Sequence, residues 1–178
     1  GRAAGGGGGA VSACTTATQN DDPDLIVESS TNVIPVHVAD SSTTGDYGYI
    51  NEPLVAVKIC SPGHTQESEC QVIRNILLDT GSFGLRVFKS AINSNVELTS
   101  NTVSVPSFGT YDLAQCAIFG TGATWGPIKK ADVLLGNQSA INTPIQVIDR
   151  DYAFIPSSCA SLADTDPCSS GFNGILGL

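Results

Sequence analysis

The chain contains few charged residues, and most of those it has are acidic. Asp, Glu, Lys and Arg together make up 14% of the 178 residues, with 17 acidic side chains against 8 basic ones and a formal net charge of −9. A surface with this balance repels the phosphate backbone of nucleic acids. The composition therefore argues against a nucleic-acid partner. It suits either a well-solvated extracellular surface or tolerance of acidic surroundings.

Three further absences narrow the function classes. No apolar stretch reaches the ~18 residues that a transmembrane helix needs, so no span is predicted. No two cysteines stand in a C-x-x-C pair, and the two histidines, His37 and His64, lack metal-ligand spacing. The segment 80–84 has Thr where a nucleophile elbow requires Gly. We therefore expect no metal, no cofactor and no serine-hydrolase site.

The remaining composition favours an all-β fold. Gly, Ser, Thr, Val, Ile and Leu dominate, and runs of helix-forming residues are scarce. A chain of this length can bury roughly 70% of its unfolded surface, so it forms one domain or one lobe of something larger. Apolar runs bounded by turn residues predict strands at residues 33–38, 54–59, 72–78, 96–98, 102–105, 114–119, 129–135 and 141–148.

Two segments are set apart from this pattern. Residues 1–31 hold five consecutive glycines followed by small and polar residues, which is typical of a flexible lead-in or surface tether. The pepsin-like lobe argued for below would occupy residues 32–178. Residues 172–178 form an apolar strand, and a terminal strand leaves an unsatisfied edge. We therefore expect the lobe to be incomplete, with chain continuing beyond Leu178.

Six cysteines, an even number, predict three disulfides and an oxidising compartment: secreted, periplasmic or cell-surface. Cys60 and Cys70 flank a polar turn between two predicted strands, which favours a bridge between them. Cys159 and Cys168 bracket a polar loop and are predicted to pair. That pairing leaves Cys14 and Cys116, which would join the lead-in to the domain.

Asp79 is the candidate for chemistry. It follows three large aliphatic residues at the end of a predicted strand, where an unpaired carboxylate would be costly. Such a carboxylate needs donors or a shared proton. Hydroxyls from Thr80 and Ser82 and the close backbone approach that Gly81 allows would supply them. This environment suits a catalytic carboxylate pair; the plain alternative is an Asp that opens a β-turn.

The segment from about Glu52 to Leu178 resembles the first lobe of the pepsin family of aspartic peptidases. The motifs occur in the family's order: a strand at 52–59, Asp-Thr-Gly-Ser at 79–82 followed by Leu85, a flap-like hairpin tip at 119–126, a returning strand at 130–136, and a hydrophobic-hydrophobic-Gly segment at 172–178. In that family the last segment threads beside the catalytic loop. More narrowly, Thr-Trp-Gly-Pro at 124–127 with residues 144–148 resembles the bacterial family DUF3443.

The pepsin-like resemblance implies peptide-bond hydrolysis by a water held between two aspartates. Asp79 would be one of them, and no second Asp-Thr-Gly or Asp-Ser-Gly occurs in the chain. The partner would come from a second lobe or from a second copy of this chain, as in retroviral peptidases. The flap residues implied to cover a peptide substrate are Phe119, Gly120, Thr121, Gly122 and Trp125.

Two departures from the pepsin pattern bear on activity. Pepsins carry a tyrosine where this chain has Phe119 and a tryptophan where it has Arg86, and those two side chains hydrogen-bond each other. Without them the flap lacks its usual polar latch. Trp125 either replaces the missing aromatic or packs within its hairpin. The alternative functions are a non-catalytic binding protein on a peptidase scaffold and a structural element of the cell surface.

Overall fold

The computed structural model describes residues 33–39, 51–120, 122–160 and 170–178, and these are mostly β. The predicted all-β class is therefore confirmed at this level. The strands are β1 (His37–Ala39), β2 (Glu52–Cys60), β3 (Cys70–Asp79), β4 (Gly84–Phe88), β5 (Thr99–Ser100), β6 (Thr102–Val105), β7 (Gly109–Asp112), β8 (Ala114–Ile118), β9 (Ala123–Leu135), β10 (Gln138–Ile148) and β11 (Gly174–Gly177). The helical turns are η2 (Glu67–Glu69), η3 (Lys89–Ala91) and α2 (Ser157–Ala160).

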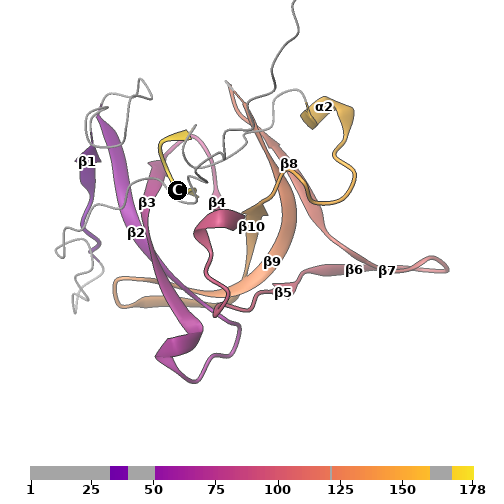
Figure 1. The fold of residues 1–178 in the computed structure, drawn as a ribbon, viewed down its shortest axis with the longest axis horizontal. Helices are drawn as coiled ribbons and strands as arrows, with labels where there is room; N and C mark the ends of the chain where they lie inside the picture. Colours follow the sequence, from indigo (N-terminus) through magenta and orange to yellow (C-terminus); the bar gives the residue numbers. More distant parts are fainter. Residues whose placement is uncertain (1–32, 40–50, 121, 161–169) are drawn as a thin grey trace, which may run out of the picture.

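Six of these strands close into a mixed barrel (Figure 1). Around it the order is β2, β3, β11, β4, β10 and β9, and pairing of β9 with β2 completes the circle. Strand β11 runs parallel to β3 and antiparallel to β4, while β10 runs parallel to β4. Strand β1 extends the sheet beside β2, and β5 and β8 pair with β9. Closure leaves these six strands without a free edge among themselves.

Every barrel strand contributes to one aliphatic core. The buried members are Leu54, Val55, Val57, Ile59, Ile73, Ile76, Leu85, Val87, Phe88, Ala91, Val96, Ala131, Val133, Ile145, Ile148, Phe172, Ile175 and Leu176. The β-branched and aromatic runs predicted as strands therefore form strands because their side chains fill this core. Burial of such side chains supplies the main favourable term in folding.

The predicted strand boundaries differ from the structure in two instructive places. Strand β9 begins at Ala123 and not at 129, because one continuous strand serves first the hairpin with β8 and then the barrel. The weak strand expected at 96–98 is absent, and β5 forms at Thr99–Ser100 by pairing with β9. Residues 102–112 form a separate two-stranded sheet, β6–β7, that projects from the barrel (Figure 1). The predicted lead-in, 1–31, lies outside the described residues.

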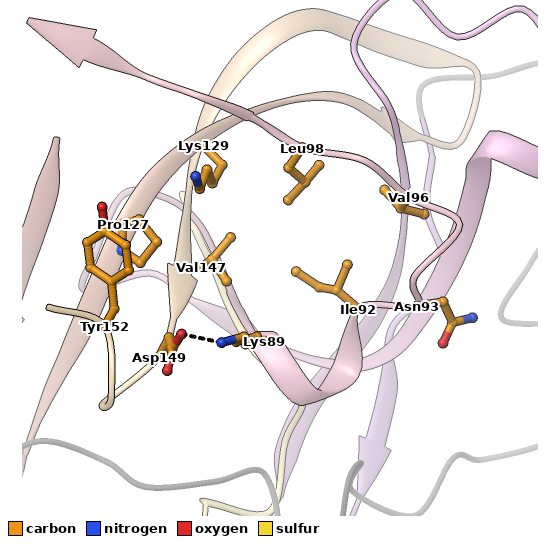
Figure 2. A pocket seen from close by; sticks show the side chains of 10 residues that line it. All are labelled: Lys89, Ile92, Asn93, Val96, Leu98, Pro127, Lys129, Val147, Asp149 and Tyr152. Atoms are coloured by element: carbon orange, nitrogen blue, oxygen red, sulfur yellow. Dashed lines mark hydrogen bonds and ion pairs between the residues drawn. The ribbon is translucent and has the colours of Figure 1, made fainter. Parts of the chain in front are cut away.

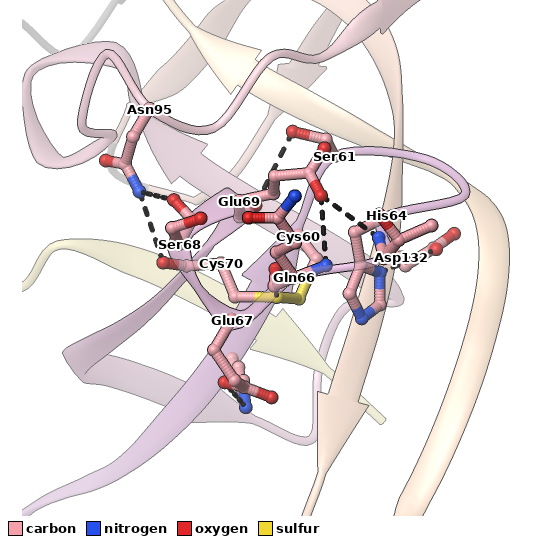
Figure 3. Close-up of a disulfide and its surroundings, with 12 residues drawn as sticks. Cys60, Ser61, His64, Gln66, Glu67, Ser68, Glu69, Cys70, Asn95 and Asp132 are labelled. Carbon is pink, nitrogen blue, oxygen red and sulfur yellow. Dashed lines mark hydrogen bonds and ion pairs between the residues drawn. A yellow bond between two sulfur atoms is a disulfide. The ribbon is translucent and has the colours of Figure 1, made fainter.

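One predicted disulfide is confirmed and the other two are wrong. Cys60 pairs with Cys70, and the two lie opposite each other in the β2–β3 ladder (Figure 3). Cys116 of β8 pairs with Cys159 of α2, which excludes the predicted bridges of Cys159 to Cys168 and of Cys14 to Cys116. The prediction paired Cys159 with Cys168 because they are close in sequence. In the structure α2 packs against the β8–β9 hairpin, and this brings Cys159 to Cys116. Cys14 and Cys168 lie outside the described residues.

These two disulfides indicate an oxidising, extracytoplasmic compartment, in agreement with the sequence. Within the described ranges, no helix is long and apolar enough to cross a membrane.

A buried carboxylate, Asp132 of β9, joins the turn after β2 to the bulge in β10. Its side chain accepts hydrogen bonds from the backbone N–H of Gly63 (2.9 Å), from His64 Nδ1 (3.1 Å) and from the N–H of Asn142 (2.7 Å). Figure 3 shows His64 beside Asp132, next to the Cys60–Cys70 bridge. Burial alone would raise the pKa of Asp132, but these donors outweigh it and hold the pKa below its usual value.

Replacement of this carboxylate tests its structural role. We expect Asp132→Asn to lower the free energy of unfolding by about 2–3 kcal/mol at neutral pH, because charge-assisted bonds are lost and an amide NH₂ faces other donors. The pKa of Asp132 is lowered in the fold, so its stabilisation is present above the ordinary carboxyl value of about 3.9 and lost as the pH falls through the folded value.

Urea unfolding of both proteins at neutral and at acid pH measures this difference. The gap between wild type and variant should shrink in acid. Asp151→Asn, an exposed carboxylate in a turn, is the matched control and should leave stability unchanged. Equal stability of wild type and Asp132→Asn at neutral pH would contradict the structural role.

Candidate functional site

Asp79 is the last residue of β3, and its backbone is held by the neighbouring strand. Its carbonyl accepts the N–H of Leu178 (3.0 Å), and it lies opposite Gly177 in the β3–β11 ladder. The preceding residues are less buried than the sequence suggested. Ile76 is inaccessible, but Leu77 and Leu78 are half-buried because β3 nears its end there. The Asp79 side chain is likewise half-buried and so accessible to a ligand.

The donors around Asp79 keep its carboxylate ionised. The Ser82 hydroxyl, the N–H of Gly81 and the charge of Arg86 together lower the pKa of Asp79 against the opposing effect of burial. Gly81 N–H donates to Oδ1 at 2.8 Å. Ser82 Oγ is buried and lies near the Asp79 carboxylate. It forms no hydrogen bond of normal geometry with any residue that the structure describes. Of the expected donors, Gly81 and Ser82 surround Asp79, whereas Thr80 is exposed.

Strand β11 separates β3 from β4 and packs against the loop that follows Asp79. Gly177 pairs with Asp79 on one side and Gly84 on the other. A Cβ atom at Gly177 would lie 2.3 Å from the backbone nitrogen of Phe83, and one at Gly174 would lie 2.3 Å from the carbonyl oxygen of Arg86. Glycine is needed at both positions for this close approach. The apolar segment therefore runs beside the Asp79 loop.

Arg86 of β4 is the residue whose role the sequence did not reveal. It is 5% exposed, and its Nη1 donates to the carbonyl of Phe83 at 2.8 Å. Its guanidinium lies over two rings, 5.9 Å from the centre of Phe83 and 5.5 Å from that of Phe119. Burial lowers the pKa of Arg86, and the nearby charge of Asp79 opposes that effect. The sequence did contain a signal for this role, since Arg86 stands within the apolar run Leu-Arg-Val-Phe. A charged side chain at a core position needs partners, so this pattern predicts a buried and partnered guanidinium.

The expected flap is a hairpin formed by β8 and the start of β9. Its tip closes with the N–H of Phe119 donating to the carbonyl of Gly122 at 2.8 Å, and residue 121 lies outside the described residues. The Phe119 ring reaches Arg86, which in turn acts on Asp79. The hairpin tip therefore lies on the same side of the barrel as Asp79.

Trp125 belongs to a different cluster from the other site residues. It packs with the Cys116–Cys159 bridge and Ile155, and its Nε1 donates to the carbonyl of Tyr152 at 2.7 Å. Only 7% of its surface is exposed. This is the arrangement expected of a packed hairpin residue, while Phe119 is the aromatic side chain that contacts the Asp79 region through Arg86.

A second perturbed carboxyl, Glu52, lies at the same end of the sheet. Leu54 pairs with Leu77, so Glu52 and Asp79 each stand two residues beyond that pair. Glu52 is 4% exposed, and neither carboxylate oxygen has a hydrogen-bond partner among the described residues. Burial raises the pKa of Glu52 to about 7, so a second carboxyl with a perturbed pKa lies at this end of the sheet.

The one cluster with metal-ligand spacing among the described residues is not a metal site. Cys60, His64 and Cys70 bring their ligand atoms within 4.8 Å of one another. Both sulfurs are joined in the disulfide drawn in Figure 3, so neither offers a thiolate.

What the Asp79 region offers chemically is one ionised, accessible carboxylate between a tight loop and a hairpin tip.

The close packing of β11 can be tested with a single methyl group. We expect Gly177→Ala to lower the free energy of unfolding by about 2 kcal/mol or more, because the added Cβ overlaps the backbone of Phe83 and forces it to move. Gly120→Ala, in the hairpin tip with nothing within 4 Å of the added Cβ, is the control and should leave stability nearly unchanged. Denaturant unfolding gives both values. Similar small losses in the two variants would show that β11 does not hold the Asp79 loop.

Comparison with known proteins places the chain in a family. The family described as "Protein of unknown function (DUF3443)" matches residues 28–178, which include Asp79, the hairpin and β11. No curated protein matches the chain. The match covers most of the sequence, and the chain belongs to the DUF3443 family.

Proposed function

We propose that this chain forms one lobe of a pepsin-like aspartic peptidase, in which Asp79 supplies one of two catalytic carboxylates. The observation that carries the proposal is the position of β11. In pepsins the hydrophobic-hydrophobic-Gly segment threads beside the catalytic loop, and here Gly177 lies directly against the loop after Asp79. Chain order alone does not require this contact, since β11 is about a hundred residues away along the sequence.

A second feature supports the proposal and accounts for the departures from the pepsin pattern. The two positions where pepsins pair a tyrosine with a tryptophan hold Phe119 and Arg86, and these also contact each other. The hydrogen-bonded latch is replaced by a guanidinium over an aromatic ring, an attraction of about 0.5–2 kcal/mol. Phe119 and Arg86 together would hold the hairpin tip over the Asp79 loop.

The proposed reaction is direct hydrolysis of a peptide bond by a bound water. Ionised Asp79 takes a proton from the water as the oxygen attacks the scissile carbonyl carbon, while a protonated partner carboxyl gives its proton to the carbonyl oxygen. As the C–N bond breaks, Asp79 gives the proton it took to the leaving amine, and the partner carboxylate takes a proton back from a hydroxyl of the tetrahedral intermediate, which becomes the carbonyl of the acid product. The donors that lower the pKa of Asp79 favour it as the charged member of the pair. The partner carboxyl would come from a second lobe or a second copy of the chain.

The surroundings of Asp79 suit an apolar peptide or a covering lobe. Phe83 and Ile118 are 75% and 61% exposed, respectively. Phe83 belongs to the Asp79 loop, and Ile118 adjoins the hairpin tip. Exposed apolar side chains around one polar group are typical of a binding surface.

The mechanism makes a prediction for Asp79→Asn in the full-length protein. Cleavage of a peptide library across pH should fall by about 10²–10⁴, because an amide cannot accept the proton from water. Thermal unfolding should be little changed, since Asn retains the shape. The lowered pKa of Asp79 keeps the base charged into acid, so activity should persist below the ordinary carboxyl value of about 3.9.

Asp151→Asn, in an exposed turn outside the site, is the matched control and should cleave normally. Undiminished cleavage by Asp79→Asn would refute the mechanism.

The cation–π contact makes a separate prediction for Arg86→Met. This variant removes the charge near Asp79 and the attraction to Phe119, so the pKa of Asp79 should rise and the acid limb of activity should move to higher pH. Loss of the contact should also raise KM by up to about 10-fold. Amide exchange at the hairpin tip should become faster. Arg86→Lys keeps a charge at this position and should shift the acid limb less; identical pH profiles in all three proteins would contradict the role.

One observation favours a second function, a non-catalytic binding protein. Arg86 already lies near Asp79 and favours its ionised form, so the carboxylate does not need to share a proton with a partner. A stable anion in an apolar setting can bind a cationic group of a ligand. Absence of cleavage by the full-length protein at every pH, with Asp79 intact, would favour this function over hydrolysis.

A further inference from the structure

A cavity lies away from the Asp79 loop, between β9, β10 and the segment that follows η3 (Figure 2). Its volume is about 370 Å³, within the range of small-molecule sites, roughly 300–1,000 Å³. None of its lining residues comes from the Asp79 loop, from β11 or from the hairpin tip. The cavity is therefore a separate site, and its interpretation does not depend on the proposed function.

The floor of this cavity is apolar. Ile92, Val96 and Leu98 contribute from the segment after η3, and Pro127 and Val147 contribute from β9 and β10. Figure 2 shows Ile92, Leu98 and Val147 facing a common space. Val96 and Val147 are each only 6% exposed, so the strands hold the floor in place. Contact between water and this apolar surface is unfavourable, so an aliphatic group that covers the surface binds with a favourable free energy.

The rim carries two of the chain's eight basic side chains, and they differ in how they are compensated. Lys89 forms an ion pair with Asp149, 2.7 Å long, which is neutral as a unit. Lys129 is half-buried, and its ammonium donates to a neutral hydroxyl, Ser100 Oγ, at 2.8 Å. Figure 2 places Lys129 and the Lys89–Asp149 pair on opposite sides of the apolar floor.

The surroundings of Lys129 hold it in place but leave bonding capacity. Ser100 passes the bond on to Asp112 at 3.1 Å, and the Tyr152 hydroxyl also donates to Asp112 at 3.4 Å. Ser100 Oγ thus bridges the Lys129 ammonium and the Asp112 carboxylate. An ammonium has three donors, and the bond to Ser100 uses one of them. A carboxylate in the cavity would accept from the others in a charge-assisted bond.

We propose that this cavity binds a medium-chain aliphatic carboxylate, with its hydrocarbon body on the apolar floor and its carboxylate on Lys129. The charge of the chain makes the choice specific: with a net charge of −9, most of its surface repels anions, whereas this rim presents an ammonium beside a neutral ion pair. The volume limits the body to a chain of modest length. A cationic amphiphile would meet Lys129 with the wrong sign.

Calorimetric titration of the full chain tests this with three probes of one body length: octanoate, 1-octanol and octylammonium. Octanoate should bind at least about 10-fold more tightly than octanol, the size expected for one charge-assisted bond, and octylammonium should bind most weakly. Lys129→Met should reduce octanoate affinity to that of octanol and leave octanol binding unchanged. Lys129→Gln provides the same test should the Met variant unfold.

Lys130→Met is the matched control, because Lys130 is the next residue of β9, carries the same charge and does not line the cavity. It should bind octanoate like the wild type. Ile92→Trp, which fills the floor, should abolish binding of both octanoate and octanol. Equal losses in Lys129→Met and Lys130→Met would show nonspecific attraction and overturn the proposal. Equal affinity for octanoate and octylammonium, or no binding of octanoate, would overturn it as well.

Discussion

The structure depends on one close contact: the backbone of β11 against the loop between β3 and β4. Gly177 has no room for a side chain beside Phe83, and Gly174 has none beside Arg86. Through this contact β11 completes the barrel and fixes the backbone of Asp79. A loop held on one side by a strand presents its side chains reproducibly, which a catalytic or binding carboxylate requires.

Arg86 shows how a buried charge can organise such a site. It reaches the Asp79 loop through the carbonyl of Phe83, the hairpin through the ring of Phe119, and the carboxylate of Asp79 through its charge. Burying a guanidinium is costly unless it is partnered, so these contacts stabilise one another. Arg86 therefore contacts the hairpin tip and also lowers the pKa of Asp79.

The few basic residues are used at particular places. Arg86 lies near Asp79, Lys89 pairs with Asp149, and Lys129 lines the cavity between β9 and β10. The chain carries a net negative charge, so each of these basic side chains makes the electrostatic potential around it locally more positive. The buried Asp132 is the converse case, an acidic group that backbone donors hold between the turn after β2 and the bulge in β10. The ion pair of Lys89 with Asp149 and the bonds to Asp132 therefore join segments of the fold, whereas the roles of Asp79 and Lys129 are those proposed above.

Local sequence patterns predicted most of the strands, the position of Asp79 at a strand end, the Cys60–Cys70 bridge and the hairpin with Phe119 at its tip. Each depends on residues close in sequence, where side-chain alternation and turn chemistry act directly. Only the tertiary structure decided the Cys116–Cys159 bridge, the burial of Glu52 and the contacts of Arg86. These depend on which distant segments meet when the barrel closes. A local sequence pattern can show that a side chain must be buried or must have an interaction partner. Which distant residue becomes that partner is decided only when the barrel closes.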